Sequence, residues 1–584
     1  MNDIRRTVLW VIFGVSLVML WDQWQIYNGR QAMFFPSTGA PAATVTTAAT
    51  SASSASASAP ALAPPPQAMA SAQAQAAAAG VPAGGGATAA VAAPETAPRE
   101  RIEVATDVLR LVFDTRGGSV VKSEFLDYAA AASGGSDKQQ PLVLLDESAA
   151  RVYVAQSGLI DSNSPPSHNF PTHETPMRFT GERQLAASAN ELTLRFQSQP
   201  VGGVTLVKTY TLRRGSYVMD VRHEVINASG APITPQLYVQ LVRDGNKPEG
   251  ESSFYSTFTG PAFYSDAKKF QKVEFKHIAN GKADFVESAP DGYVAMVQHY
   301  FASAWLLDSG AKHGNFVRTL SENLYSAGMI ESLGTLADGA SAQVSARLFI
   351  GPQKEKMLES IAAGLGSVKD YGLFAILSKP LYWLLDKLHA AIGNWGWSIV
   401  ALVFLLKLAF YWLNARAYAS MAKMKAINPR IMDLRESLKD KPQLMQQEMM
   451  RIYREEKVNP LGGCLPILVQ IPVFIALYWV LLSSVEMRGA PWVLWVSDLS
   501  VKDPYFILPI LMTLSTLLQT ALNPAPPDPM QAKMMWIMPM AFSVMFFFFP
   551  AGLVLYWITN NLLSIAQQWV INKRMGVPPQ FNLP

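Results

Sequence analysis

The sequence predicts a multidomain membrane protein with an N-terminal anchor helix, an all-β domain, and a helical core of five transmembrane spans. Charged residues make up only 16% of the 584 residues, against about 25% in typical soluble proteins. Apolar segments close to the ~20 residues that cross a bilayer lie near the two ends of the chain. The middle of the chain instead alternates apolar and polar residues, as strands with one buried face do.

Charge and motif content exclude several classes of protein. The formal net charge of +4 leaves no domain-wide basic excess, so we expect no direct nucleic-acid partner. A single cysteine rules out an intramolecular disulfide framework. The sequence has no G-x-x-x-x-G-K-[ST] loop and no H-E-x-x-H motif, and its seven histidines lack metal-ligand spacing. We therefore expect no enzyme, no catalytic residue, no cofactor and no metal.

The first 30 residues predict a retained anchor. Arg5 and Arg6 precede an apolar run at 8–20, and bulky aromatic residues follow it where a cleavage site would need small ones. The alternative is a cleaved signal peptide. The arginines place the N-terminus in the cytoplasm. Residues 31–98 are rich in Ala, Pro and Ser, and 31–94 hold no charge, so we expect a disordered tether there.

Residues 99–351 predict an antiparallel β-sandwich on the far side of the membrane. The stretch 109–114 alternates, and a turn at 115–118 with two glycines follows it. The stretches 204–212 and 217–225 repeat the pattern, each with one apolar face. The sandwich needs no disulfide, because a domain of this size can bury a sufficient core. His223 is expected to be a buried side chain of the sandwich.

The helical core begins after a connecting region at 352–391. Within it, 378–389 is amphipathic and predicts a helix lying along the membrane surface; the alternative is the first turns of a spanning helix. The core, 392–571, contains five apolar segments, at 392–413, 465–482, 505–522, 534–549 and 552–571.

Loop charges set the predicted topology. Residues 414–460 carry ten Lys or Arg, whereas 483–504 carry only Arg488 and Lys502. The tail, 572–584, adds Lys573 and Arg574. Because basic loops stay in the cytoplasm, both termini are expected inside and the β domain outside, in the periplasm of a Gram-negative inner membrane.

The basic loop 414–460 predicts a cytoplasmic helical hairpin. Helices are expected at 415–427, 429–438 and 443–457, with apolar residues at three- and four-residue spacing on the last. Its methionines either fill the hairpin core or accept partners, and the hairpin as a whole is either a specific element or a solvated connection. The residues selected as candidates here are Arg416, Met421, Met424, Glu448, Met449 and Tyr453.

Lys407 is the strongest single functional signal, because it is the only charge between Lys387 and Arg416. A lysine inside a span either extends toward the interface or faces a polar cavity. Polar residues on other spans could line such a cavity or could simply join helices by hydrogen bonds. Cys464 is expected to be a small buried residue. The candidate groove residues are Lys407, Gln470, Gln519, Tyr556, Asn560 and Asn561.

Several segments resemble the YidC family of membrane protein insertases. They are 421–424, 447–450, 456–466, 470–472, 528–530 and 549–556, with 115–118 and 258–264 resembling the periplasmic domain of the Gram-negative form. The resemblance implies a β-supersandwich and a five-helix core with a hydrophilic groove open to the cytoplasm and to lipid. The family's characteristic groove arginine corresponds here to Lys407, which keeps the charge but loses the bidentate fork.

The resemblance also implies the partners. These are nascent membrane proteins, components of the Sec translocon, membrane lipids, and the ribosome or the signal recognition particle receptor. The short tail at 572–584 lacks the long basic extension by which some relatives bind ribosomes.

Two other classes of function remain as alternatives. A solute transporter or channel with a periplasmic sugar-binding domain would commonly show repeated span pairs, and the sequence has no internal repeat. A structural envelope-assembly factor would use its spans only as anchors, for which five closely spaced spans with polar residues exceed the need.

Overall fold

The computed structural model describes residues 99–130, 140–163, 165–248, 257–307, 310–438, 441–456, 465–523 and 529–576. All of them belong to one compact unit. The predicted anchor and tether, Cys464, and residues 577–584 of the tail lie outside the described residues.

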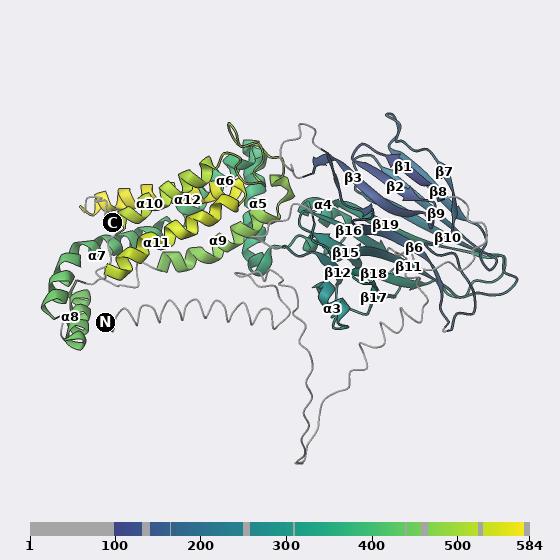
Figure 1. The fold of residues 1–584 in the computed structure, drawn as a ribbon, viewed down its shortest axis with the longest axis horizontal. Helices are drawn as coiled ribbons and strands as arrows, with labels where there is room; N and C mark the ends of the chain where they lie inside the picture. The colour runs from purple at the N-terminus through teal and green to yellow at the C-terminus, as the bar shows by residue number, and fades with distance from the viewer. Residues whose placement is uncertain are drawn as a thin grey trace, which may run out of the picture. The chain divides into compact units, whose positions relative to one another are not determined.

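Two antiparallel sheets form the first part of the described chain (Figure 1). The first sheet runs in the order β1 (Arg101–Ala105), β2 (Leu109–Asp114), β3 (Ser119–Ala129), β6 (Val152–Asp161), β11 (Pro235–Asp244), β18 (Leu324–Ser332), β17 (His313–Ser321) and β14 (Ser288–Ala289), with β4 (Pro141–Val143) on β3 and β5 (Asp146–Glu147) on β6. The second runs β13 (Lys269–Lys272), β12 (Gly260–Ser265), β15 (Tyr293–Gln298), β16 (Phe301–Leu307), β19 (Ser341–Pro352), β10 (Val218–Asn227), β9 (Val204–Arg213), β8 (Glu191–Ser198) and β7 (Met177–Gly181). The predicted all-β, antiparallel region is confirmed.

The alternating sequence pattern explains how the sheets bury their core. On β9 and β10, Tyr210 lies opposite Val221 in register, and both are 1% exposed. Phe113 of the first sheet stacks on Phe196 of the second, with ring centroids 5.5 Å apart. The turn between β2 and β3 needs glycine, because Gly117 has φ +72° and an added Cβ would lie 2.2 Å from a backbone oxygen.

A lysine interrupts the apolar face of β9. Lys208 is fully buried, and its Nζ donates to the carbonyl oxygens of Gly117, at 2.6 Å, and Ser157, at 2.7 Å, both on the first sheet. His223 of β10 is also buried, as expected, and bonds the Ser157 hydroxyl at 2.8 Å. These contacts join the two sheets by hydrogen bonds inside the core. The alternating pattern alone did not reveal the role of Lys208, because all the other residues on this face of β9 are apolar or aromatic.

Helices make up the rest of the described chain. They are α3 (Phe275–Ala279), α4 (Glu355–Ile361), α5 (Ala375–Ile392), α6 (Trp395–Ala409), α7 (Tyr411–Ser437), α8 (Pro442–Glu455), α9 (Leu465–Ser483), α10 (Ile507–Leu522), α11 (Pro529–Met545) and α12 (Ala551–Arg574), with short 3-10 turns η1 (Leu365–Val368), η2 (Gly372–Phe374), η3 (Val485–Met487) and η4 (Phe546–Phe548). Helix α12 packs against α6, α9 and α10 (Figure 1).

The predicted first core span, 392–413, is not one helix. Helix α5 ends at Gly393, which has φ +76°, and Asn394 caps α6 by accepting from the Trp397 amide at 3.0 Å. Helix α6 ends at Ala409, and α7 follows after a bend of 68°. The amphipathic segment at 378–389 is therefore a separate helix rather than the first turns of α6.

By length and hydropathy, none of the single helices among the described residues meets the requirement for crossing a membrane. The bent pair Trp395–Ala409 and Tyr411–Met424 meets it when taken together. The shorter apolar helices are Gln470–Ser483, Ile507–Leu522 and Ala532–Phe548.

Helices α7 and α8 pack against each other in the region of the predicted hairpin, and the structure corrects the bounds of the first helix. We predicted separate helices at 415–427 and 429–438, but α7 runs unbroken through Pro429. The fold overrides the helix-breaking tendency of proline because Ile427 and Ile431, on either side of it, pack together with Ile452 of α8. This buried cluster gives the hairpin a hydrophobic core of its own.

Candidate functional site: a cavity between four helices

Lys407 is a buried cation in the last turn of an otherwise apolar helix. It lies on α6 with 6% of its surface exposed. Its Nζ donates to the Ser564 hydroxyl of α12 at 2.7 Å. Among the described residues, Lys407 forms no ion pair with a carboxylate. Its side chain thus points toward a neighbouring helix, as the polar-cavity alternative requires, and its charge is left without an anionic partner.

Helix α12 supplies the polar side that faces Lys407. Asn560, Ser564 and Gln567 follow at intervals of four and three residues, so they share one face of the helix. The Gln567 side chain donates to the Lys407 carbonyl oxygen at 3.2 Å and accepts from Asn414 at 3.4 Å. The backbone and the side chain of Lys407 are therefore both held by α12.

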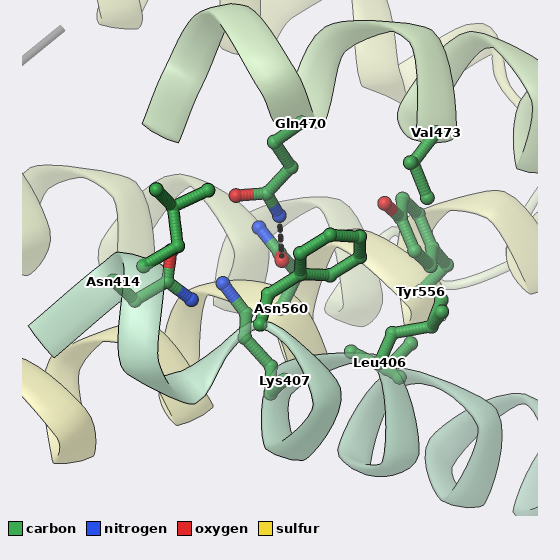
Figure 2. A pocket seen from close by; sticks show the side chains of 10 residues that line it. Leu406, Lys407, Asn414, Gln470, Val473, Tyr556 and Asn560 are labelled. Atoms are coloured by element: carbon green, nitrogen blue, oxygen red, sulfur yellow. Dashed lines mark hydrogen bonds between the residues drawn. The ribbon is translucent and has the colours of Figure 1, made fainter. Parts of the chain in front are cut away.

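Lys407, Asn414, Gln470, Tyr556 and Asn560 line a cavity of about 30 Å³, with apolar residues completing its wall (Figure 2). This volume has room for roughly two water molecules. The Gln470 side chain of α9 donates to Asn560 Oδ1 of α12 at 2.8 Å, across the cavity. The bond ties α9 to α12, so the cavity is narrow in this structure.

Aromatic rings form the apolar end of the site. Tyr556 stacks against Phe474 of α9 with ring centroids 5.8 Å apart, and Trp557 meets Phe474 edge-on at 4.6 Å. Polar and apolar surfaces thus succeed each other along the same pair of helices, α9 and α12.

The structure brings together four of the six predicted groove residues: Lys407, Gln470, Tyr556 and Asn560. Asn561 faces elsewhere and donates to Ser515 and Thr516 of α10 at 3.1 and 2.9 Å. Gln519, on α10, is half-buried and does not line this cavity.

Ser564 and Gln567 are among the polar span residues that we expected could line a cavity, although neither was one of the six selected candidates. Asn414 was not predicted. The four-residue spacing from Asn560 to Ser564 is the sequence signal that could have favoured Ser564 over the other polar residues.

Three of the six hairpin candidates contribute to the hairpin core. The side chains of Met424, Met449 and Tyr453 pack against the buried isoleucines of the hairpin. The two methionines therefore fill the hairpin core. The remaining three lie outside this cluster. The Cζ of the exposed Arg416 lies 3.7 Å from the centroid of the Trp412 ring. The half-buried Glu448 pairs with Arg451 at 2.8 Å, and Met421 is half-buried.

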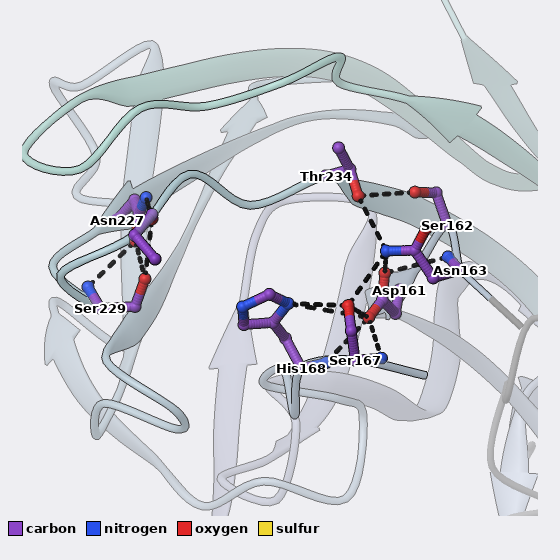
Figure 3. A network of polar contacts seen from close by, with 9 residues as sticks. Asp161, Ser162, Asn163, Ser167, His168, Asn227, Ser229 and Thr234 are labelled. Atoms are coloured by element: carbon purple, nitrogen blue, oxygen red, sulfur yellow. Dashed lines mark hydrogen bonds and ion pairs between the residues drawn. The ribbon is translucent and has the colours of Figure 1, made fainter. Parts of the chain in front are cut away.

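A second polar cluster lies in the β domain, in the loop after β6 (Figure 3). The Asp161 carboxylate accepts from the backbone amides of Asn163, Ser167 and His168 at 3.0, 2.6 and 2.8 Å. Burial acts to raise the pKa of Asp161, but these hydrogen bonds hold it below its usual range. The acceptors are consumed within the loop, so the cluster organises the loop. Within the described ranges, no group of His, Cys, Asp or Glu could hold a metal ion.

The described residues form a β domain joined to helices, and these helices enclose a buried lysine that forms no ion pair with a carboxylate among those residues. Comparison with known proteins identifies the class to which this arrangement belongs. The profile for the YidC periplasmic domain matches residues 101–384, and the profile for the 60Kd inner membrane protein matches residues 387–577. The chain is 52% identical over 577 residues to the membrane protein insertase YidC of Cupriavidus necator, covering 98% of each chain. It is 52% identical to that of Ralstonia nicotianae over 574 residues and 50% identical to that of Bordetella pertussis over 574 residues, again with 98% coverage of each chain.

The chain therefore belongs to the YidC family of membrane protein insertases. Among solved structures, it is similar to an active YidC insertase with its first transmembrane domain resolved, at 19% identity and a TM-score of 0.36, covering 81% of this chain and 92% of the other. It also matches a putative aldose 1-epimerase from Escherichia coli K12, at 10% identity and a TM-score of 0.25, covering 44% of this chain and all of that one.

Proposed function

We propose that this insertase moves client segments through a groove between α6, α9 and α12, and that the cavity around Lys407 is the closed form of that groove. The observation that carries the proposal is the buried Lys407 ammonium, which contacts a hydroxyl and, within the described part of the chain, no carboxylate. A charge is costly inside a membrane, and such residues usually mark the path of a substrate or ion.

In the proposed mechanism, Lys407 solvates the polar or acidic flank of an entering client. A lysine offers a point charge rather than a bidentate fork, so it attracts an anionic group without fixing its geometry. The apolar part of the client slides along the aromatic end of the site, beside Tyr556 and Phe474, and then partitions into lipid. Because this partitioning is favourable, the step needs no nucleotide.

Client entry requires the groove to widen. A cavity of about 30 Å³ cannot admit a peptide segment, so α9 and α12 must separate. The Gln470–Asn560 hydrogen bond is the contact that breaks in this step. An interhelical bond of this kind is worth about 0.6 kcal/mol in a membrane, so breaking it is a small barrier.

The topology extends the proposal to the whole chain. Five core spans and an N-terminal anchor cross the inner membrane of a Gram-negative cell, with both termini in the cytoplasm. The β domain forms a supersandwich in the periplasm, and the hairpin of α7 and α8 receives or gates clients. Partners are nascent membrane proteins and components of the Sec translocon, with the ribosome or the signal recognition particle receptor delivering clients.

The charge of Lys407 provides the test. We expect Lys407→Glu to lower insertion of a client with an acidic flank about tenfold, or ~1.4 kcal/mol in the barrier, whereas Lys407→Arg keeps most of the activity. The measurement is insertion of purified clients, one with an acidic and one with a neutral flank, into vesicles that contain the full chain. Lys573→Glu, an exposed charge at the end of α12, is the control. Equal activity of the two Lys407 variants on both clients would remove the electrostatic role.

A further inference from the structure

A third buried lysine, Lys369, lies far from the groove, where the chain enters α5. The Lys369 side chain is fully buried, and its Nζ lies 3.6 Å from Glu486 Oε2, which belongs to the turn η3 directly after α9. The ammonium also lies 3.8 Å from the centroid of the Tyr382 ring on α5. The Tyr382 hydroxyl donates to the other oxygen of Glu486, Oε1, at 2.7 Å. We call these three residues the Lys369 cluster.

The cluster joins two helices that also touch along their length. Ser378 of α5 donates from its hydroxyl to the Ala476 carbonyl oxygen of α9 at 3.2 Å, and both residues are buried. Gly372 of η2 packs so closely on α9 that an added Cβ would lie 2.7 Å from the Trp479 ring. The last two turns of α9 are thus held against η2 and α5.

This attachment lies at the opposite end of α9 from the groove. Gln470 and Ser483 are thirteen residues apart on the helix, which corresponds to about 20 Å. A helix held at one end can swing at the other, and in α9 Pro472 lies between the held end and Gln470. The angle at which the held end is fixed therefore decides how closely Gln470 approaches Asn560.

We infer that the Lys369 cluster is a positioning device that clamps the outer end of α9 to α5 and so sets the width of the groove at Gln470. The inference rests on the proposed function for the meaning of groove width. The clamp suits this task because the Tyr382 hydroxyl bond to Glu486 fixes direction as well as distance, which an apolar contact does not. The Lys369 ammonium adds charge attraction to Glu486 at 3.6 Å, without a hydrogen bond between these two atoms, and a contact with the Tyr382 ring.

The test compares loss of the pair with loss of a matched pair. Lys369→Met with Glu486→Leu replaces both charges by apolar volume, which buried ion pairs commonly tolerate without loss of stability. The control is Lys356→Met with Asp386→Leu, because that ion pair also reaches α5, at 2.6 Å, but its lysine is exposed.

The first readout is the yield of cross-linking between cysteines at 470 and 560 by a short thiol reagent, in the full chain with Cys464→Ser. The second is vesicle insertion, and thermal unfolding reports folding.

We expect the Lys369–Glu486 double variant to keep its unfolding temperature but to lose at least half of its cross-linking yield and to insert clients at least threefold more slowly. Lys369→Arg, which keeps the cation over the ring, should retain both signals, and the control pair should change neither. Tyr382→Phe removes only the hydroxyl bond to Glu486 and should give an intermediate loss of cross-linking. This variant therefore tests the inference even if the double variant does not fold.

Unchanged cross-linking in both the folded double variant and Tyr382→Phe would overturn the inference. The cross-linking readout reports helix position without any client. A loss of cross-linking with normal insertion would therefore support the positioning role of the Lys369 cluster but contradict the proposed role of groove width in insertion.

Discussion

The buried lysines Lys208 and Lys407 have different roles because their surroundings differ. Lys208 in the β domain donates to two carbonyl oxygens at 2.6 and 2.7 Å, whereas the described contacts of the Lys407 ammonium include only one hydroxyl, at 2.7 Å. Backbone carbonyls inside a sandwich are fixed, so Lys208 holds sheets together. A cation beside a small cavity with few partners retains the capacity to attract an anionic group, and this is the physical basis for assigning the client role to Lys407.

The environment of Lys208 predicts how the stability of the β domain depends on pH. Burial lowers the pKa of Lys208 to about 7 from its ordinary 10.5. Between these values the unfolded chain binds a proton that the folded chain has released. The free energy of unfolding should therefore rise with pH from about 7 to about 10.

The measurement is the unfolding temperature of the full chain and of Lys208→Met at pH 7 and pH 9.5, because the difference between the two proteins cancels the contribution of other groups. We expect the wild type to gain several degrees relative to the variant at the higher pH. The same difference at both pH values would show that Lys208 does not titrate in this range.

At the residue scale, sequence reasoning found the charge but could not select its partners from among the polar residues of the other spans. A lysine among apolar residues is conspicuous, so Lys407 could be predicted. Asn560 and Asn561 look equivalent in sequence, yet successive helical residues point about 100° apart. One therefore faces α9 and the other α10, and the choice depends on packing that the sequence does not state.

At the scale of elements, the hairpin is held together by few residues. Ile427, Ile431 and Ile452 are its buried core, and each is at most 8% exposed. A pair of helices with so small a core depends on each of these side chains. Removing one leaves a cavity that the few surrounding residues cannot fill by moving inward.

We predict that Ile452→Ala destabilises the hairpin by about 2–4 kcal/mol and lowers insertion, because the loop then presents clients with an unfolded surface. Met450→Ala is the matched control, since Met450 is on the same helix but 44% exposed. Protease resistance of α7 and α8 and vesicle insertion measure the two effects. A hairpin that becomes protease-sensitive while insertion stays normal would contradict a role for its folded form.

The elements also show where local signals fail. Period-two alternation correctly located β2, β9 and β10, because a strand with one buried face leaves a direct mark on the sequence. Hydropathy located the helical segments, but it merged α6 with the end of α5 and the start of α7 into one predicted span, 392–413. The breaks at Gly393 and Phe410 are local backbone events inside a continuous apolar run, and hydropathy averages over them.

At the scale of the whole molecule, composition gave the division into a β region and a helical region, and the described residues confirm that division. The narrow width of the cavity beside Lys407 could not be predicted. The sequence shows that polar residues lie on several helices, but the width of a cavity depends on interhelical distances set by contacts such as Gln470–Asn560.

The central claim, that clients pass between α9 and α12 beside Lys407, is tested most directly by locking that gap. In the Cys464→Ser chain with cysteines at 470 and 560, joining the two by a short cleavable thiol reagent should abolish insertion of purified clients into vesicles, and cleaving the reagent should restore it. The control joins cysteines at 515 and 561, a pair that ties α12 to α10 away from the cavity and should leave insertion unchanged. Full insertion by the protein cross-linked between 470 and 560 would contradict the claim.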